Sequence, residues 1–160
     1  EGKRQLWKYN GKQWDSGIKL NGCKDVFALC EDTQGTIWAG GEGDNAIWKY
    51  FYQKNRFYGI ILLDSTEVSA FAIDRHNFLC AAGAGRNKIW VKQEKDNWAT
   101  ANLEDCIAVY AISAGKNVIA AGGWNLKRRG RMWIRKNNVW SKGSDLKDCY
   151  VVRALAYTNE

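Results

Sequence analysis

The chain has 160 residues, of which 46% are hydrophobic, and a net charge of +7 at pH 7. This hydrophobic content excludes an intrinsically disordered chain, and no apolar run approaches the ~18 residues needed to cross a membrane. The length predicts one domain that is large enough to bury a core, and the positive charge permits an acidic partner without requiring one.

The predicted secondary structure is all-β, and its strands follow one another in a regular order. Two short strands are predicted within 6–20, and four-stranded segments follow at 23–62, 66–103 and 106–146. Each segment contains four short apolar runs, which we name strands A to D in chain order, with turn residues between them. A single strand A is predicted at 149–157. Gly and Asn interrupt the apolar runs too often for a helix.

An internal repeat underlies this order. Three columns of residues recur together along the chain. The first column is Trp7, Trp48, Trp90 and Trp133, spaced 41, 42 and 43 residues apart. The second column is Trp14, Phe57, Trp98 and Trp140, and the third, at the start of strand A, is Cys23, Thr66, Cys106 and Cys149. Because the three columns recur with nearly the same spacing, each repeat of about 42 residues is predicted to be one structural unit.

Residue size within the repeat favours a radial arrangement. Strand A carries small residues such as Ala28 and Ala70, whereas strands C and D each carry a large aromatic residue. Small groups near an axis and large groups further out suit the taper of a β-propeller, and we therefore predict an all-β propeller with about four blades of four antiparallel strands. A β-helix is the alternative, but its coils repeat on a shorter period.

The stretch EDTQGTIWAGGEGDNAIWKY, residues 31–50, resembles the propeller repeats of two-component regulators, whose blades read D-x-x-G-x-I-W-x-G before a Gly-rich turn and an aromatic strand. The matching residues are Asp32, Gly35, Ile37, Trp38 and Gly40. Later repeats depart from this pattern, and the Gly-His and Trp-Asp pairs of WD repeats are absent from all of them. The resemblance implies a WD-like propeller, and it implies no particular function.

The repeats begin and end out of phase with whole blades. Strands C and D come first and a single strand A comes last, which is typical of propellers that close by joining their ends. Strand B of that shared blade is missing, and an open propeller edge would leave backbone groups unpaired. We expect a larger parent chain to complete the ring or, alternatively, a second copy in a homodimer.

The longest loop follows strand B of the third segment and reads WNLKRRGR, residues 124–131. The equivalent turns in the other segments are shorter, so this loop places extra cations beside an aromatic ring. Such a group suits a carboxylate, a phosphate or a nucleic acid, by charge and by stacking. Alternatively, it is a solvated basic turn that contributes only to solubility. The predicted contact residues are Trp124, Asn125, Lys127, Arg128, Arg129 and Arg131.

A second group of candidates is acidic and lies in the loops that lead into strand A, at one end of the predicted channel. Its members are Asp64, Glu67, Asp105 and Asp148. A ring of carboxylates would suit a cation or a basic ligand. We favour a simpler explanation, in which Asp residues before a strand satisfy local backbone donors in a turn.

Neither an enzyme nor a cofactor is expected. His76 is the only histidine, and it falls in the predicted turn between strands A and B of the second segment. The five cysteines contain no CxxC motif, so we predict no metal site, although a zinc-binding ring of thiols is an alternative. Small unpaired cysteines and the lack of a signal-peptide pattern favour a reducing, cytoplasmic location.

Together these features predict a non-catalytic platform that binds a protein or peptide, with an acidic segment as the candidate ligand. A glycan-binding, lectin-like propeller is the alternative, because the chain has nine Trp residues. Eight of the nine fall in strand positions that suit inter-blade core, and the polar loop residues differ from repeat to repeat. We expect neither membrane binding nor nucleic-acid binding.

Overall fold

The computed structural model shows an all-β chain in which every paired strand is antiparallel. It describes residues 5–15, 17–73, 78–86, 88–115 and 118–156, so the predicted turn around His76 lies outside the described residues. The helical content of the described part is two short 3₁₀ turns, η1 (Tyr52–Lys54) and η2 (Glu94–Asp96), and no helix there is long and apolar enough to span a membrane.

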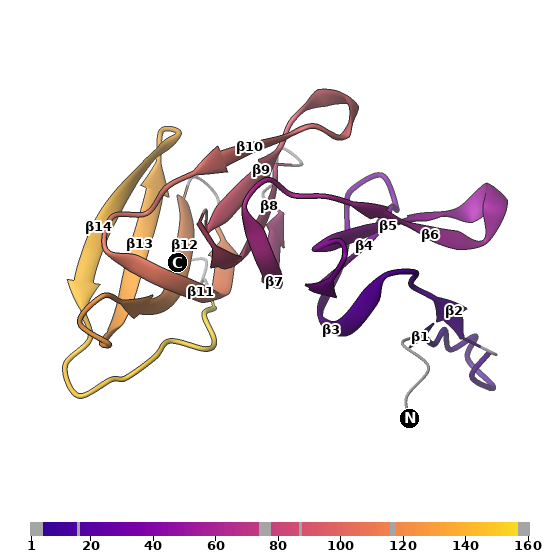
Figure 1. Cartoon of the computed structure of the whole chain (residues 1–160), viewed down its shortest axis with the longest axis horizontal. Helices are drawn as coiled ribbons and strands as arrows, with labels where there is room; N and C mark the ends of the chain where they lie inside the picture. The colour runs from indigo at the N-terminus through magenta and orange to yellow at the C-terminus, as the bar shows by residue number, and fades with distance from the viewer. Residues whose placement is uncertain (1–4, 16, 74–77, 87, 116–117, 157–160) are drawn as a thin grey trace.

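Three four-stranded blades stand side by side in an arc, and a small hairpin lies beyond the first blade (Figure 1). Single residue pairs, Glu42 with Glu67 and Ala84 with Ala108, join the blades into one 12-stranded sheet. Blade 1 contains β3 (Cys23–Glu31), β4 (Ile37–Gly43), β5 (Ile47–Phe51) and β6 (Arg56–Ile60). Blade 2 contains β7 (Ser65–Ile73), β8 (Leu79–Gly85), β9 (Ile89–Lys92) and β10 (Trp98–Ala101). Blade 3 contains β11 (Cys106–Ala114), β12 (Val118–Asn125), β13 (Gly130–Lys136) and β14 (Val139–Asp145). This is the predicted order of strands A to D, three times over.

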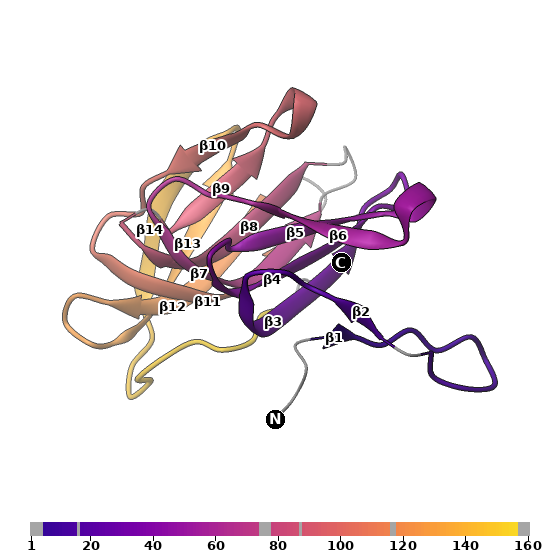
Figure 2. The same ribbon diagram turned by 45° about the vertical axis from the view of Figure 1, so that its right-hand side comes forward.

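The two strands of the hairpin at the N-terminal end are shorter than the strands predicted within 6–20. It contains β1 (Gln5–Leu6) and β2 (Ile18–Lys19), with one further bridge between Tyr9 and Trp14. Figure 2 shows that the chain between β1 and β2 projects away from the three blades. The prediction of a strand at 149–157 is wrong for the part that is described, because residues 146–156 form no strand. That segment still donates a backbone hydrogen bond from Val152 to Gly123 on β12, at 3.2 Å.

The strand A column also needs one correction. Ser65, rather than Thr66, occupies the position of Cys23, because Ser65 pairs with Gly85 as Cys23 pairs with Gly43. A shared hydrogen bond confirms this register, because the side chains of Cys23 and Ser65 each donate to the carbonyl oxygen two residues ahead. With Ser65 in the column, the spacings from Cys23 to Cys149 become 42, 41 and 43 residues.

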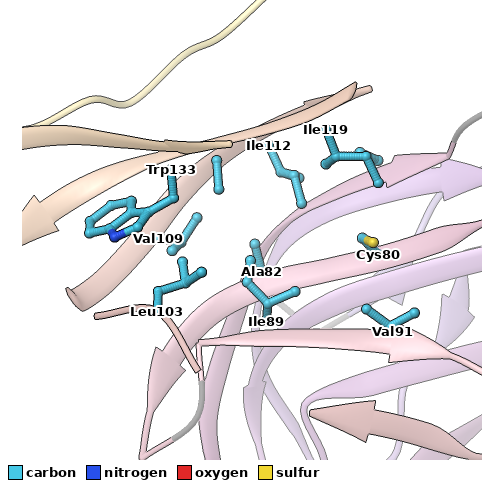
Figure 3. Packing of buried hydrophobic residues seen from close by; sticks show 11 residues of the cluster. Cys80, Ala82, Ile89, Val91, Leu103, Val109, Ile112, Ile119 and Trp133 are labelled. Atoms are coloured by element: carbon cyan, nitrogen blue, oxygen red, sulfur yellow. The ribbon is translucent and has the colours of Figure 1, made fainter. Parts of the chain in front are cut away.

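The core lies between the blades. Figure 3 shows the cluster between blades 2 and 3, in which Ala82 and Ile89 face Val109, with Trp133 beside them. The Trp column contributes some of the largest fully buried side chains, with exposed fractions of 0%, 0% and 1% for Trp48, Trp90 and Trp133. Burying such large side chains between the sheets is the main favourable term that holds the blades together.

Small residues on strand B allow the next blade to approach closely. A Cβ atom added at Gly40 would lie 2.5 Å from Cγ1 of Val68, on the first strand of the following blade. At Gly122 the same atom would lie 2.5 Å from Cγ1 of Val152. The C-terminal segment therefore packs on blade 3 as the first strand of blade 2 packs on blade 1, although it forms no ladder. Strand B thus requires a glycine or alanine where a neighbouring blade covers it.

Candidate functional site

The loop between β12 and β13 exposes three cations on a well-anchored turn. Asn125 is 1% exposed, and its Oδ1 accepts hydrogen bonds from the backbone amides of Lys127 and Arg129, at 2.9 and 3.0 Å. Its Nδ2 donates to Asp145 at 2.9 Å. Arg128 closes the turn with a φ of 56°. Asn125 therefore shapes the loop from within, and the side chains of Lys127, Arg128 and Arg129 lie exposed to solvent.

Arg131 lies in an internal charge network rather than on the surface. Its side chain is 7% exposed, its Nε donates to Asp145, and its Nη1 lies 3.3 Å from Oδ2 of Asp105. Lys142 also contacts Asp105, with Nζ 2.7 Å from the same oxygen. The hydrogen bond from Arg131 lowers the pKa of Asp145, and that from Lys142, together with Arg131, lowers the pKa of Asp105. These carboxylates are thus already neutralised within blade 3.

A hollow of about 570 Å³ lies between this loop and the segment that follows β14. Its walls include Arg128 and Arg129 from the loop and Lys147, Asp148 and Tyr150 from the segment. Two of the sequence predictions therefore meet here: cations of the long loop and one of the acidic residues before strand A. The hollow thus brings charged side chains, an aromatic ring and open volume together.

Trp124 packs against Tyr150, one of the residues that line the hollow. It is partly buried, and its ring centroid lies 5.9 Å from that of Tyr150, at an interplanar angle of 52°. Its Nε1 is buried and has no hydrogen-bond partner among the described residues. Tyr150 is 58% exposed and presents its ring to the hollow. Sequence reasoning missed Tyr150 because it assigned residues 149–157 to a strand, and it gave no role to Lys147, which directly precedes the acidic candidate Asp148. The aromatic residue directly after the Cys149 column position was the available signal.

The acidic candidates mostly follow from turn geometry. Asp64, Asp105 and Asp148 have φ angles of 57°, 57° and 58°, and Gly22 has 71° at the equivalent position before blade 1. In each turn the next residue donates its amide hydrogen to the carbonyl three residues back, at 3.3 Å. A positive φ at this turn position favours Gly, Asn or Asp. Glu67 differs, since it lies on β7 opposite Glu42 of β4.

The recurring Trp column of the three blades is unavailable for stacking on a sugar. The indole N–H groups of Trp48, Trp90 and Trp133 each donate to a backbone carbonyl in the turn before strand A of the same blade, at 2.9, 3.1 and 3.0 Å. Their rings are fully covered. A lectin-like site repeated around the blades therefore finds no platform in this column.

The cysteines provide no metal site in the part of the chain that the structure describes. No group of three or more His, Cys, Asp or Glu side chains there is placed to hold a metal ion. All five thiols are free. Burial raises the pKa of Cys30 and of Cys106 to about 12, so both are protonated at neutral pH. Thiolates, not thiols, are the ligands that zinc requires.

Comparison with known proteins agrees with this architecture. Residues 20–43 match the family model described as two component regulator propeller. The fold is similar to that of the RRP9 WD40 repeats (TM-score 0.67, 15% identity, covering 87% of this chain and 43% of that one) and of U3-55K (TM-score 0.67, 15% identity, 87% and 44%). It is also similar to a chain of a mitotic checkpoint complex (TM-score 0.68, 15% identity, 91% and 46%).

This chain therefore spans less than half the length of each of these structures. At 15% identity the likeness shows the β-propeller fold alone. No curated protein sequence matches the chain.

Proposed function

We propose that this chain is a non-catalytic protein-interaction scaffold, and that the hollow of blade 3 binds an acidic segment of its partner. The fold supports the general part of the proposal, because a propeller holds variable loops on a rigid frame. One of the similar structures is a mitotic checkpoint complex, in which a propeller is part of an assembly. The charge of the hollow supports the specific part.

The observation that carries the proposal is a surplus of cations around the hollow. Arg128, Arg129 and Lys147 line it, all exposed. Of the two carboxylates there, Asp145 is bound by Arg131, which leaves Asp148 as the nearby counter-charge. Guanidinium groups bind carboxylates with two parallel hydrogen bonds, so exposed arginines beside a hollow suit an acidic ligand.

The surroundings of the cations suit a peptide. Tyr150 lines the hollow together with the arginines, and Leu126, 67% exposed, belongs to the same loop as they do, so both offer apolar contacts. An acidic segment with neighbouring apolar residues would contact both kinds of surface. Tyr and Arg are also the residue types that most often dominate binding energy at protein interfaces.

The test is fluorescence anisotropy with fluorescein-labelled hexaglutamate, and with hexaglutamine as the neutral probe. Replacing both Arg128 and Arg129 by Ser is expected to weaken hexaglutamate binding about tenfold, a loss of about 1.4 kcal/mol. The matched control replaces two exposed cations elsewhere, Arg86 and Lys136, and is expected to change binding less than about twofold. Binding should also weaken between about 50 and 200 mM NaCl.

Two results would contradict the proposal. Equal weakening by both double variants would mean that only the net charge matters. Equal binding of hexaglutamate and hexaglutamine would mean that the arginines do not recognise carboxylates. Circular dichroism spectra of both variants would first establish that they retain their β structure.

A further inference from the structure

The hairpin of β5 and β6 carries a group of cations and aromatic rings on the side that contacts blade 2. The hairpin reaches outward from blade 1, away from β14 (Figure 1). On that side, Lys49 is the cross-strand partner of Tyr58, and Phe51 is the partner of Arg56. Lys54 lies in η1, the turn between the two strands. We call these five residues the Tyr58 cluster.

The repeat does not require the residues of this cluster. Lys49 directly follows the column Trp of its blade, and Tyr58 lies opposite it. The equivalent cross-strand pairs of the other blades are uncharged and lack a ring: Val91 with Ala99 in blade 2, and Ile134 with Ser141 in blade 3. A blade therefore forms without a lysine or a tyrosine at these positions, and the fold alone does not explain their presence in blade 1.

One cation of the cluster is neutralised within the protein, whereas two are not. Nζ of Lys49 lies 2.6 Å from Oδ2 of Asp96, in η2 of blade 2. Lys54 and Arg56 are exposed, and neither forms a salt bridge with a residue that the structure describes. Instead, Nζ of Lys54 lies 5.6 Å and Cζ of Arg56 lies 4.2 Å from the ring centroid of Tyr58. The ring thus holds two uncompensated positive charges close to each other.

The hydroxyl group of Tyr58 is the unusual member of the cluster. It is buried, yet it has no hydrogen-bond partner in the described part of the chain. Such groups are rare in folded proteins, because a buried hydroxyl without a partner costs free energy. Burial opposes ionisation of the phenol, but Lys54 and Arg56 outweigh it and lower the pKa of Tyr58. The two cations therefore create a positive potential at the hydroxyl, where a negatively charged group would be stabilised.

We propose that Lys54, Arg56 and Tyr58 bind a phosphate group on a phosphorylated side chain of a partner protein. A phosphoserine or phosphothreonine presents three acceptor oxygens and a charge of about −1.5 to −2. The ammonium, the guanidinium and the phenol O–H supply donors for three oxygens, whereas a carboxylate offers two. The site lies in blade 1, apart from the hollow, and does not depend on the function proposed for the hollow.

The composition of the cluster favours a single phosphate over a nucleic acid. A nucleic-acid strand carries a phosphate at every nucleotide, and it binds in a positively charged groove that follows its backbone. Here two cations carry uncompensated charge, and Asp96 neutralises Lys49 beside them. Phe51 is 36% exposed, and its ring centroid lies 4.7 Å from that of Tyr58, so it offers an apolar contact to residues that flank the phosphate. A phosphorylated protein segment fits both features.

The test is fluorescence anisotropy with a fluorescein-labelled GLSLG peptide, with and without a phosphate on its serine. The phosphorylated form is expected to bind at least about tenfold more tightly. Tyr58→Phe keeps the ring but removes the O–H, so it should weaken binding of this form about tenfold. Lys54→Gln with Arg56→Gln should weaken it more. The matched control, Arg86→Gln with Lys136→Gln, also removes one exposed arginine and one exposed lysine, and should change binding less than about twofold.

Thermal unfolding separates binding from a structural role. If the hydroxyl of Tyr58 served the fold, its removal would lower the Tm. We expect Tyr58→Phe to leave the Tm unchanged or to raise it, because the substitution removes a buried polar group that has no partner. The double variant with Ser at Arg128 and Arg129 should bind the phosphorylated peptide normally, so failure of the hollow and failure of the Tyr58 cluster are distinguishable.

Four results would overturn this inference. The first is equal binding of the phosphorylated and unphosphorylated peptides, and the second is undiminished binding by Tyr58→Phe. The third is a lower Tm of Tyr58→Phe, which would assign the hydroxyl to the fold. The fourth is tighter binding of inorganic phosphate or of a labelled oligothymidylate, weakened by the same substitutions, which would assign the cations to the free ion or to nucleic acid.

Discussion

Replacing Asp32 by Ala tests how the repeat motif stabilises a blade. Its carboxylate is almost buried and accepts hydrogen bonds from the amides of Gln34 and Thr36, at 3.0 and 2.9 Å, and from Nε1 of Trp38, at 3.0 Å. Asp32→Ala leaves the indole N–H of Trp38 unpaired in a site with 0% exposure. An unpaired buried donor costs about 1–3 kcal/mol, so we expect the free energy of unfolding to fall by about 3 kcal/mol once the lost amide contacts are included.

Urea unfolding followed by far-UV circular dichroism measures this loss. The control is Asp15→Ala, because Asp15 accepts hydrogen bonds from the amides of Lys8 and Gly17 at an exposed turn but binds no buried indole; we expect a loss of about 1 kcal/mol or less. In a Trp38→Phe background the effect of Asp32→Ala should shrink. A loss below about 0.5 kcal/mol, or an equal loss in both backgrounds, would refute the reasoning.

The same carboxylate gives the stability a pH dependence of known sign. Burial alone would raise the pKa of Asp32, but the hydrogen bonds from Trp38, Thr36 and Gln34 outweigh it and lower the pKa. The stabilisation is therefore complete above the ordinary Asp pKa of about 3.9 and disappears as the pH falls through the lower value of the folded state. The difference in stability between the wild type and Asp32→Ala should shrink over that acid range.

Two further predictions concern the Arg131 network and the thiols. Arg131→Gln should lower the free energy of unfolding by about 1–3 kcal/mol, because it removes the buried guanidinium that binds both Asp105 and Asp145. Urea unfolding measures this loss, with the exposed Lys136→Gln as control, and equal losses would contradict the network. Cys30 and Cys106 should not react with DTNB in the native protein at about pH 8, where an ordinary thiol is partly ionised, because burial raises the pKa of each to about 12. Thiol titration before and after unfolding checks this, and rapid native reaction of either would contradict it.

The blades were predictable because the repeat constrains them at several positions at once. A Trp every 41 to 43 residues, a Gly or Ala on strand B and an apolar strand A all follow from one interface geometry. The ends were less predictable, because the same sequence pattern has different neighbours there. Residues 149–156 have the composition of strand A and pack as one through Val152, yet without a partner ladder they form no strand.

The candidate site was predictable only in part, for an electrostatic reason. The composition of the loop correctly indicates a cluster of cations, but it does not show which of them are exposed. Arg131 is internal because its partners, Asp105 and Asp145, come from 26 and 14 residues away along the chain. Asn125 is internal because its side chain accepts hydrogen bonds from backbone amides of the turn. A buried position for a charged residue depends on such distant partners, and no local pattern reports them.

The repeat determines the position of a residue in its blade, whereas the residues around that position determine its role. In blades 1, 2 and 3 the residues two positions before the column Trp are Ala46, Lys88 and Arg131. All three are buried, although Ala46 is apolar and the other two carry a charge. The guanidinium of Arg131 binds the carboxylates of Asp105 and Asp145, and Asp145 lines the hollow. In the same way, Trp7 and Trp48 occupy one column, yet Trp7 is 56% exposed whereas Trp48 is fully buried. The proposed site in blade 3 thus forms where a position that is apolar in blade 1, at Ala46, carries a buried charge instead.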